Sequence, residues 1–244
     1  MSKPNNWLEP DWPAPEQVHA VTTLRTGGVS GGAFSSLNPA MHVGDDPDLV
    51  RHNRQLIKDR LALPSEPVWL EQIHSNRVIE AAKAQLLMPA DASYAAETGI
   101  VCAVMTADCL PLLLCDVEGT HVAAIHAGWR GLLAGIIGNT VAAMPRRELL
   151  VWLGPAIGPE CFEVGAEVRA AFLERSADFS RVFKQQANGK WLADIYQMAR
   201  IELAHLGINK IFGGHFCTVT EQDRFYSYRR DKVTGRMATL IWRD

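Results

Sequence analysis

The chain has 244 residues, of which 48% are hydrophobic and 21% are charged, as in an ordinary soluble globular protein. Its net charge is −3 without any run of like charges, so we expect no nucleic-acid partner and no membrane adsorption. No segment approaches the roughly 20 apolar residues of a membrane span, and the amino terminus lacks the apolar core of a signal peptide. The five cysteines are an odd number, which favours reduced thiols in the cytoplasm over a disulfide framework.

The amino-terminal half of the chain predicts strands, loops and one helix. After an irregular lead-in over residues 1–17, a β-branched apolar run predicts a strand over 18–24. The pair Asp46-Pro47 is a helix start signal and predicts a helix over 47–61. Further expected elements are a strand over 68–73 that delivers His74, a hairpin strand over 77–80, a variable excursion over 81–89, and buried apolar strands over 100–106, 110–115 and 121–126.

The carboxyl-terminal half predicts helices over 132–144 and 164–175, and a looser segment follows over 178–190. Apolar residues at spacings of three to four predict an amphipathic helix over 192–206 that Gly207 ends. Strands are expected over 149–153, 208–213, 216–219, 224–228 and 236–242. Because strands and helices mix without strict βαβ alternation, we predict an α+β fold with mixed sheets, as a single domain over 1–244.

A glycine-dense loop, R-T-G-G-V-S-G-G, follows the first expected strand and begins at Arg25. Residues 28–32 match the pattern G-x-S-x-G of serine hydrolases, but that pattern requires a helix directly after the serine. Here the turn-rich run A-F-S-S-L-N-P-A follows instead, so we do not predict a serine hydrolase. The backbone amides of the loop, together with Arg25, are candidates for anion binding, and a flexible surface loop is the alternative.

Three metal-capable side chains lie at the ends of expected apolar strands: His74, Cys109 and His126. Zinc takes imidazole nitrogen and thiolate sulfur, and three protein ligands leave a fourth position for water or substrate. Water in that position can have a pKa near 7. No C-x-x-C or H-E-x-x-H motif joins these residues, so hydrogen-bonded structural histidines are the alternative.

Other polar residues offer less specific signals. Cys102 and Cys115 lie in apolar runs and are expected to pack as small hydrophobes, as is Cys217. The planar guanidinium of arginine suits bidentate capture of phosphate or carboxylate. Candidates for this role, with surface solvation as the alternative, are Arg25, Arg130, Arg229 and Arg230.

Several enzyme classes are disfavoured by missing motifs. The zinc deaminase signature, the P-loop and a convincing dinucleotide-binding motif are all absent. None of the eight histidines forms an H-x-H pair, which the trinuclear cluster of a copper oxidase would require. We therefore disfavour a copper polyphenol oxidase.

Four longer motifs occur in a fixed order: T-A-D-C-L-P (106–111), H-A-G-W-R-G (126–131), L-G-P-A-I-G-P (153–159) and F-Y-S-Y-R-R-D (225–231). The runs R-T-G-G-V-S and W-L-E-Q-I-H precede them. With these motifs the chain resembles the YfiH family from about residue 18 to its carboxyl end. This family has also been called the laccase-domain or polyphenol-oxidase family, and it includes a bacterial peptidoglycan editing factor.

The resemblance implies a layered α/β/β/α fold and a zinc site of two histidines and one cysteine. Carried over by position, these ligands are His74, Cys109 and His126. The implied activity is phosphorolysis of purine nucleosides (adenosine, inosine, guanosine and methylthioadenosine), with some deamination of adenosine.

As a mechanism, we expect phosphate at the open position of the zinc, held by Arg25 and Arg229. Asp108, next to Cys109, would support the ligands or carry a proton. For deamination, the same position would carry hydroxide to C6 of the purine. Cys109 and His126 would therefore act in catalysis as zinc ligands.

The main alternative is a cysteine hydrolase that uses Cys109 with His126 on peptidoglycan precursors, because a thiolate beside an imidazole is a competent nucleophile. A non-enzymatic metal-binding scaffold is the third hypothesis. No exposed apolar stripe is predicted, so we expect a monomer or a weak homodimer.

Overall fold

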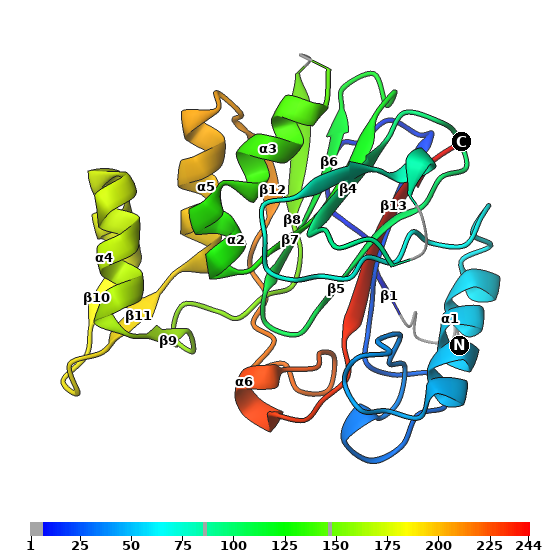
Figure 1. Ribbon diagram of the computed structural model, residues 1–244, viewed down its shortest axis with the longest axis horizontal. Helices are drawn as coiled ribbons and strands as arrows, with labels where there is room; N and C mark the ends of the chain where they lie inside the picture. The colour runs from blue at the N-terminus through cyan, green and yellow to red at the C-terminus, as the bar shows by residue number, and fades with distance from the viewer. Residues whose placement is uncertain (1–6, 85–86, 146–147) are drawn as a thin grey trace.

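Two β-sheets stack face to face at the centre of the molecule, and helices cover their outer faces (Figure 1). The computed structural model describes residues 7–84, 87–145 and 148–244. Residues 1–6 of the expected lead-in and residues 85–86 of the expected excursion lie outside these ranges. Within the described residues, none of the helices is long and apolar enough to cross a membrane.

The smaller of the two central sheets has four antiparallel strands. Their order is β1 (Trp7–Leu8), β2 (Val18–Thr23), β13 (Met237–Arg243) and β5 (Cys102–Thr106). The carboxyl-terminal strand β13 therefore lies inside the sheet, between β2 and β5. The two-residue strand β1 shows that the lead-in, expected to be irregular over 1–17, begins its described part with a short strand.

The larger sheet has six strands. Their order is β12 (Lys210–Gly213), β8 (Leu149–Leu153), β6 (Leu110–Asp116), β7 (Val122–Ala127), β4 (Ala92–Ala95) and β3 (Val78–Glu80). Pairs β12·β8 and β3·β4 are parallel, and the other neighbours are antiparallel, so the sheet is mixed. Every residue of β6 and β7 is buried, which explains their continuous apolar sequences.

Alternate residues of β6 face two different cores. Leu112 and Leu114 pack towards the helices, whereas Leu113 and Cys115 pack towards the four-stranded sheet. A third core lies between the four-stranded sheet and α1 (Pro47–Arg60). The Asp46 side chain caps α1 by accepting a hydrogen bond from the backbone N–H of Asp48 at 2.8 Å, as the start signal predicted.

The outer face of the six-stranded sheet is covered by α2 (Trp129–Ala134), α3 (Ile136–Ala143) and α5 (Ile195–His205). The resulting order of layers is α1, four-stranded sheet, six-stranded sheet, and α2, α3 and α5. The mixed-sheet fold class and the α/β/β/α arrangement implied by the resemblance are confirmed.

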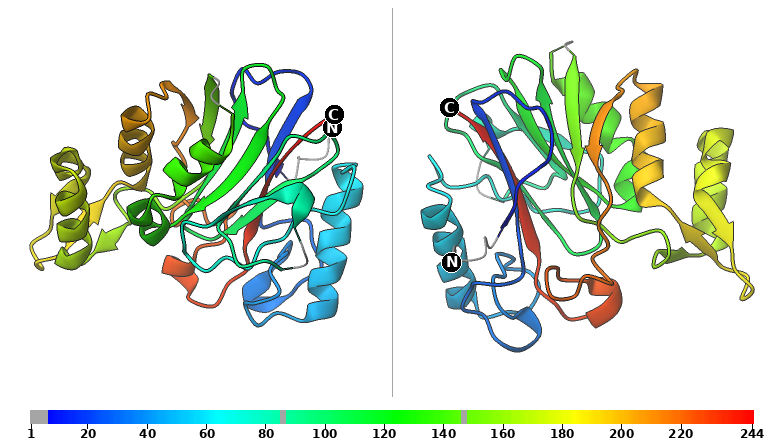
Figure 2. Two further views of the ribbon diagram at one scale, coloured as in Figure 1. Left: turned by 45° about the horizontal axis from the view of Figure 1, so that its top comes forward. Right: turned by 180° about the vertical axis from the view of Figure 1, so that it is seen from behind.

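A smaller unit extends sideways from these layers (Figure 2). It contains α4 (Ala166–Arg175), a 3-10 helix (Ala177–Val182) and a three-stranded sheet of β10 (Phe183–Gln185), β11 (Trp191–Ala193) and β9 (Glu163–Val164). Phe172 and Phe179 of this unit are fully buried and join it to the main helical core. Two further 3-10 helices (Gly32–Phe34, Ala81–Lys83) and α6 (Tyr228–Asp231) lie in loops.

Several predicted elements were wrong. Residues 68–73 make two isolated bridges, at Val68 and Glu71, and not a strand. Strand β3 is not part of a hairpin, because it pairs in parallel with β4. The helix expected over 132–144 is broken at Gly135, whose φ of 86° is left-handed, into α2 and α3.

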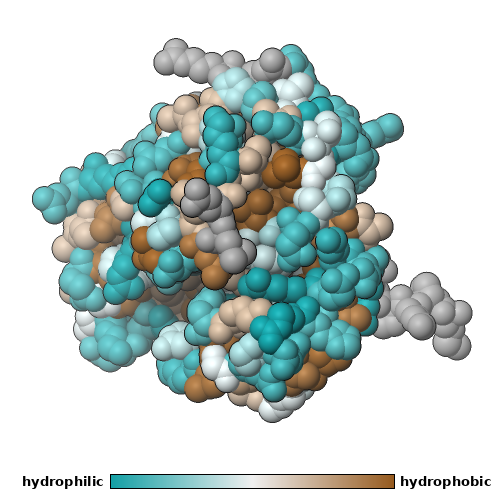
Figure 3. All heavy atoms as spheres, turned by 45° about the vertical axis from the view of Figure 1, so that its right-hand side comes forward, coloured by the Kyte–Doolittle hydropathy of each residue, from teal (hydrophilic) through white to brown (hydrophobic). Residues whose placement is uncertain are grey.

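The strands expected over 216–219 and 224–228 are loops and the start of α6. Their apolar residues Phe216, Phe225 and Tyr226 pack into the core between the sheets. These residues are apolar because they are buried between the two sheets, although the segment does not pair as a strand. On the face drawn in Figure 3, hydrophilic residues dominate, and hydrophobic residues appear in smaller groups between them.

Candidate metal centre

His74, Cys109 and His126 lie together at one end of the central sheets. One ligand atom of each residue lies within 4.8 Å of the ligand atoms of the other two. The Cys109 Sγ is 3.9 Å from Nε2 of His74, and the rings of His74 and His126 meet edge to face with centroids 4.8 Å apart. His126 is buried, Cys109 is partly buried and His74 is exposed, so the cluster is open on the His74 side.

A side-chain interaction holds the segment before His74. The Gln72 amide donates to the carbonyl of Met105 at 2.8 Å and accepts from the N–H of Met105 at 2.7 Å. In this way one side chain makes the two hydrogen bonds to β5 that a neighbouring strand would make. His74 itself has a φ of 59°, a left-handed conformation that costs free energy for a residue with a β-carbon.

Cys109 occupies the turn between β5 and β6, and Asp108 shapes this turn. Asp108 has a φ of 88° and its backbone carbonyl accepts a hydrogen bond from Ile157 at 2.9 Å. Its carboxylate accepts from the hydroxyl of Thr218 and from the backbone N–H of Arg229, both at 2.6 Å. Asp108 therefore joins the Cys109 turn to two loops that are distant in sequence.

Asp91 connects the two histidines. Its Oδ1 accepts hydrogen bonds from Nδ1 of His126 at 2.8 Å and from the backbone N–H of His74 at 3.0 Å. Its Oδ2 accepts from the N–H and the hydroxyl of Ser75, at 2.6 and 2.7 Å. A carboxylate that accepts from a ring nitrogen leaves the other ring nitrogen of His126, Nε2, as the atom that could bind a metal.

Asp91 was missed as a functional residue by the sequence analysis. It is fully buried, and burial alone would raise its pKa, but hydrogen bonds from His126 and Ser75 outweigh burial and lower that pKa. The sequence did contain a signal for Asp91: an acidic residue directly before an apolar strand. Cys109 was recognised as a candidate in the same kind of position.

The cluster favours a thiolate at neutral pH. Burial opposes ionisation of Cys109, but His126 and His74 outweigh burial and lower the pKa of its thiol to about 6. Burial likewise disfavours the imidazolium of His126, but Cys109 and Asp91 raise the pKa of His126 to about 9. A thiolate beside imidazole nitrogens is the donor set that zinc prefers.

Gly128, in the motif H-A-G-W-R-G, leaves room for the cluster. A β-carbon at this position would lie 2.9 Å from Sγ of Cys109 and 3.2 Å from Cδ2 of His74. Both contacts are shorter than normal van der Waals contacts. Position 128 therefore tolerates no side chain without displacing the cluster.

The donor set and its spacing fit a zinc ion. With bonds of 2.0–2.3 Å, the ligand atoms of a tetrahedral zinc site lie roughly 3.3–3.7 Å apart, so the cluster needs shifts of about an ångström to close on the metal. Among the residues that the structure describes, His74, Cys109 and His126 form a group of three potential metal ligands whose ligand atoms all lie within 4.8 Å of one another. These three residues could therefore hold a metal ion.

Two cavities open onto the cluster. One, of about 390 Å³, lies between the main body and the α4 unit and is lined by His74, Cys109, Trp129, Arg130, Phe162 and Arg229, among others. The other, of about 220 Å³, is lined by His42, Gln72, His126, Tyr228 and Arg236 as well as His74 and Cys109. Sequence reasoning missed His42 and Arg236, which stand outside the motifs that drew attention.

The predicted anion-binding arginines lie in different places. Arg229 lines the larger of these cavities, where its Nη1 donates to the carbonyl of Glu163 at 2.9 Å. Arg25 lines neither of the two cavities; its guanidinium donates to the carbonyls of Ser35 and Gln222 and lies 5.0 Å from the ring centroid of Tyr226. The structure brings Arg229, but not Arg25, beside the cluster.

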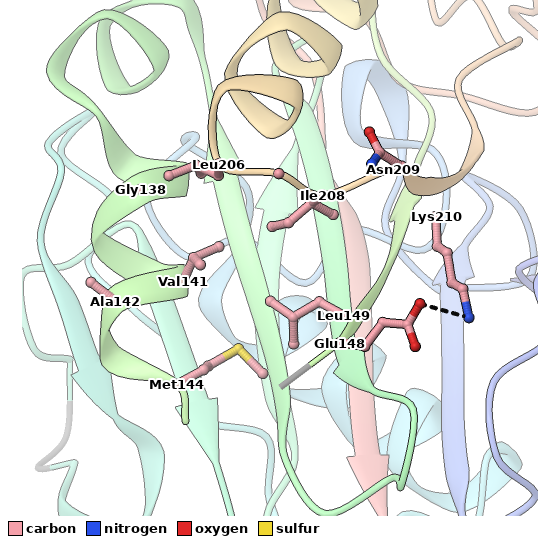
Figure 4. Close-up of a pocket in the computed structure, with 11 residues that line it drawn as sticks. Gly138, Val141, Ala142, Met144, Glu148, Leu149, Leu206, Ile208, Asn209 and Lys210 are labelled. Atoms are coloured by element: carbon pink, nitrogen blue, oxygen red, sulfur yellow. Dashed lines mark ion pairs between the residues drawn. The ribbon is translucent and has the colours of Figure 1, made fainter. Parts of the chain in front are cut away.

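A larger cavity, of about 780 Å³, lies elsewhere, between α3, α5, β8 and β12 (Figure 4). Apolar side chains such as Val141, Met144 and Leu149 line it. Its charged residues Glu148 and Lys210 are already paired at 2.9 Å. Because the described residues that line it offer no nucleophile and no metal ligand set, size alone does not make it the reactive site.

The family model described as multi-copper polyphenol oxidoreductase laccase matches residues 19–244. A relative from Pseudomonas aeruginosa, named purine nucleoside phosphorylase, is 53% identical over 241 residues, which cover 98% of each chain. Purine nucleoside phosphorylase YfiH of Escherichia coli (strain K12) is 52% identical over 238 residues, which cover 96% of this chain and 98% of that one.

Solved structures agree with the fold along the whole chain. The crystal structure of a Neisseria meningitidis protein matches with a TM-score of 0.95 at 49% identity and covers 98% of this chain and 100% of that one. YlmD from Geobacillus stearothermophilus matches with a TM-score of 0.92 at 31% identity, covering 100% of this chain and 98% of that one.

Replacing Gly128 with Ala should abolish tight metal binding, because the new β-carbon would push Cys109 and His74 apart. Zinc content after purification and titration with a competing chelator measure the effect. The matched control is Gly138→Ala in α3, where a β-carbon meets nothing within 4 Å. This control should keep the metal and gain about 0.5–1 kcal/mol of stability. Equal zinc affinity in both variants would contradict the close-approach argument.

Replacing Asp91 with Asn should weaken zinc affinity about 10- to 100-fold, because His126 loses the carboxylate that orients its ring. Competition with a fluorescent zinc chelator measures the affinity. Asp116→Asn is the control, since Asp116 is another buried acid, which pairs with Thr120 and His121 away from the cluster. If the Asp91→Asn protein bound zinc as tightly as the control, Asp91 would not contribute to metal binding.

In chelator-treated protein, iodoacetamide should alkylate Cys109 at pH 7 faster than Cys161. The pKa of Cys109 is lowered to about 6, so its thiolate is formed above that pH, whereas burial and Cys217 raise the pKa of Cys161. The rate at Cys109 should therefore fall only when the pH drops through about 6. Peptide mapping identifies the modified thiols. Added zinc should protect Cys109, and lack of protection would exclude it as a ligand.

Proposed function

Because this chain belongs to the YfiH family, whose model is described as multi-copper polyphenol oxidoreductase laccase, we propose that it is a zinc-dependent purine nucleoside phosphorylase. The observation that carries this proposal is the His74–Cys109–His126 cluster, of which His74 and Cys109 line a cavity that also holds Arg130 and Arg229. Relatives about half identical over nearly their whole length bear the name purine nucleoside phosphorylase.

Zinc supports the proposal better than a multi-copper centre. A metal held by His74, Cys109 and His126 would supply an electrophilic position that binds an oxygen anion or lowers the pKa of water. A multi-copper oxidase needs several ions and many histidine ligands, whereas the described residues contain one three-residue cluster of this kind. Copper polyphenol oxidation therefore finds no support in the ligand set.

We assign phosphate binding to the wall formed by Arg130 and Arg229. Both line the cavity beside Cys109, and a guanidinium can donate two parallel hydrogen bonds to phosphate. The contact between Arg229 and the Glu163 carbonyl orients the side chain and leaves further N–H groups free to donate. Arg25, which we also considered for this role, would need to leave two carbonyl partners and Tyr226 to reach the cavity.

The apolar walls of the same cavity suit a purine nucleoside. Aromatic and aliphatic side chains there can cover the flat base: Trp129, Ile157, Phe162, Val168, Ile195 and Tyr228. In the reaction, an oxygen of phosphate bonds to C1′ of the ribose while the bond from C1′ to the purine nitrogen breaks, and the purine takes up a proton. Positive charge develops on the sugar in between, so the enzyme must hold the phosphate anion against it.

Asp108 acts in this scheme as a positioning residue. Its carboxylate already accepts hydrogen bonds from Thr218 and from the backbone of Arg229. It therefore holds α6, with Arg229, against the turn that carries Cys109. This assignment favours support of the site over the proton-carrier role.

Adenosine deamination would use the same cavity, with water in place of phosphate and C6 of the purine in place of C1′.

A cysteine hydrolase acting on peptidoglycan precursors is the second candidate function. The observation that favours it is the lowered pKa of Cys109 beside His126, because a thiolate is a nucleophile as well as a ligand. Chelation separates the two, since it stops a zinc enzyme and spares a thiol hydrolase.

Replacing His126 with Ala should lower the rate of inosine phosphorolysis by about a hundredfold or more. The variant lacks one of the three proposed metal ligands and the hydrogen bond from that ligand to Asp91. Hypoxanthine and ribose-1-phosphate are measured with and without phosphate, and adenosine is tested in parallel for inosine formed without phosphate. The control is His205→Ala, a surface histidine paired with Asp178. Undiminished ribose-1-phosphate formation in the His126→Ala protein would refute the proposal.

Replacing Arg229 with Gln should raise the KM for phosphate roughly tenfold or more, because a charge-assisted hydrogen bond to the anion is lost. The KM for inosine should change much less. Arg25→Gln is the matched variant, and it should leave the KM for phosphate unchanged. The reverse pattern, with Arg25 and not Arg229 affecting phosphate, would transfer the anion site to the glycine-dense loop.

A further inference from the structure

Cys161 and Cys217 both contact the turn at Gly158, and neither belongs to the His74–Cys109–His126 cluster. The N–H of Gly158 donates to Sγ of Cys217 at 3.3 Å, and the carbonyl of Gly158 accepts from the N–H of Cys161 at 3.0 Å. A β-carbon on Gly158 would lie 3.0 Å from Sγ of Cys217, so the glycine allows the thiol to sit against this turn. Both thiols are free and partly exposed.

The two thiols differ in character. Burial opposes ionisation of Cys217, but hydrogen bonds from Thr220, Gly158 and Val219 outweigh burial and lower the pKa of its thiol. Burial raises the pKa of Cys161, and the neighbouring Cys217 raises that pKa further through its charge and a hydrogen bond between the two side chains. A partly exposed thiol with a lowered pKa, close to a second cysteine on the same turn, is the arrangement typical of a peroxide-sensitive pair.

We propose that Cys161 and Cys217 form a reversible disulfide when the protein meets hydrogen peroxide or a small organic hydroperoxide. The Cys217 thiolate attacks the peroxide, so a sulfur–oxygen bond forms and the oxygen–oxygen bond breaks; hydroxide leaves from hydrogen peroxide, and an alkoxide leaves from an organic hydroperoxide. The Cys161 sulfur then attacks the sulfenic acid, a sulfur–sulfur bond forms, and the hydroxyl group leaves as water with the thiol proton. In total, two electrons pass from the two sulfurs to the peroxide, and hydrogen peroxide is reduced to one hydroxide ion and one water molecule.

The location of the pair connects its oxidation to the reactive cavity. Thr218, directly after Cys217, donates its N–H to the carbonyl of Ala156 and its hydroxyl to Asp108. Phe162 and Glu163, directly after Cys161, line the cavity beside the metal cluster. A disulfide has a specific geometry, so its formation would constrain the two loops relative to each other. Oxidation should therefore change the cavity without any reaction at Cys109.

The test treats zinc-loaded protein with a few equivalents of hydrogen peroxide, followed by alkylation and digestion without reductant. Mass spectrometry should find the peptides of Cys161 and Cys217 joined, with the loss of two hydrogen atoms, and dithiothreitol should restore both thiols. In the Cys161→Ser variant, dimedone should trap a sulfenic acid at Cys217. In the Cys217→Ser variant, dimedone should not label Cys161.

Two controls separate this site from the metal centre and from the proposed activity. The cross-link should still form in Cys109→Ser, because the metal ligand takes no part in it. Under reducing conditions the Cys161→Ser variant should keep the basal rate and lose the reversible inhibition by peroxide. The proposal is overturned if Cys217 goes to sulfinic acid without a cross-link, or if a different pair of cysteines is joined. Since the cross-link is read by mass, failure of the phosphorylase assignment would leave this outcome unaffected.

Discussion

The carboxylate of Asp91 accepts hydrogen bonds from the His126 ring, from the His74 backbone and from Ser75, and the geometry of the cluster depends on these contacts. His74 lies in a loop and in a left-handed conformation that would relax if it were free. His126 lies in a rigid buried strand. By joining the loop to the strand, one buried acid fixes the position of His74 relative to His126, as a candidate metal site requires.

The layered fold brings the remaining parts to the same end of the sheets. Buried strands β6 and β7 carry Cys109 and His126 at their adjoining ends, where Pro111 pairs with His126. Gly128 lets α2 begin directly against the cluster. Asp108 then ties the Cys109 turn to the loop of Thr218 and to α6, which adds Arg229 to the cavity. The cavity is thus built from segments that are far apart in sequence and meet only through packing and hydrogen bonds.

The sequence allowed the buried strands to be predicted well, because a strand covered on both faces must be apolar along its whole length. The same rule failed at residues 216–228, where Phe225 and Tyr226 are apolar because they fill the core between the sheets and not because they pair in a strand. The strand predicted over residues 68–73 was wrong for a different reason. The Gln72 amide replaces strand pairing, and a single side chain that imitates a strand leaves no periodic signal.

The side chains that can bind a metal follow from the residue types alone, since imidazole and thiolate chemistry belongs to His74, Cys109 and His126 whatever the fold. The family likewise follows from the sequence, through four long motifs in a fixed order. The role of Asp91 in orienting the cluster, and the position of Arg229 but not Arg25 beside it, became visible only in the folded chain. Such pairings join residues up to 121 positions apart, as between Asp108 and Arg229. Contacts over this separation depend on how whole layers pack, and no local pattern of residues encodes them.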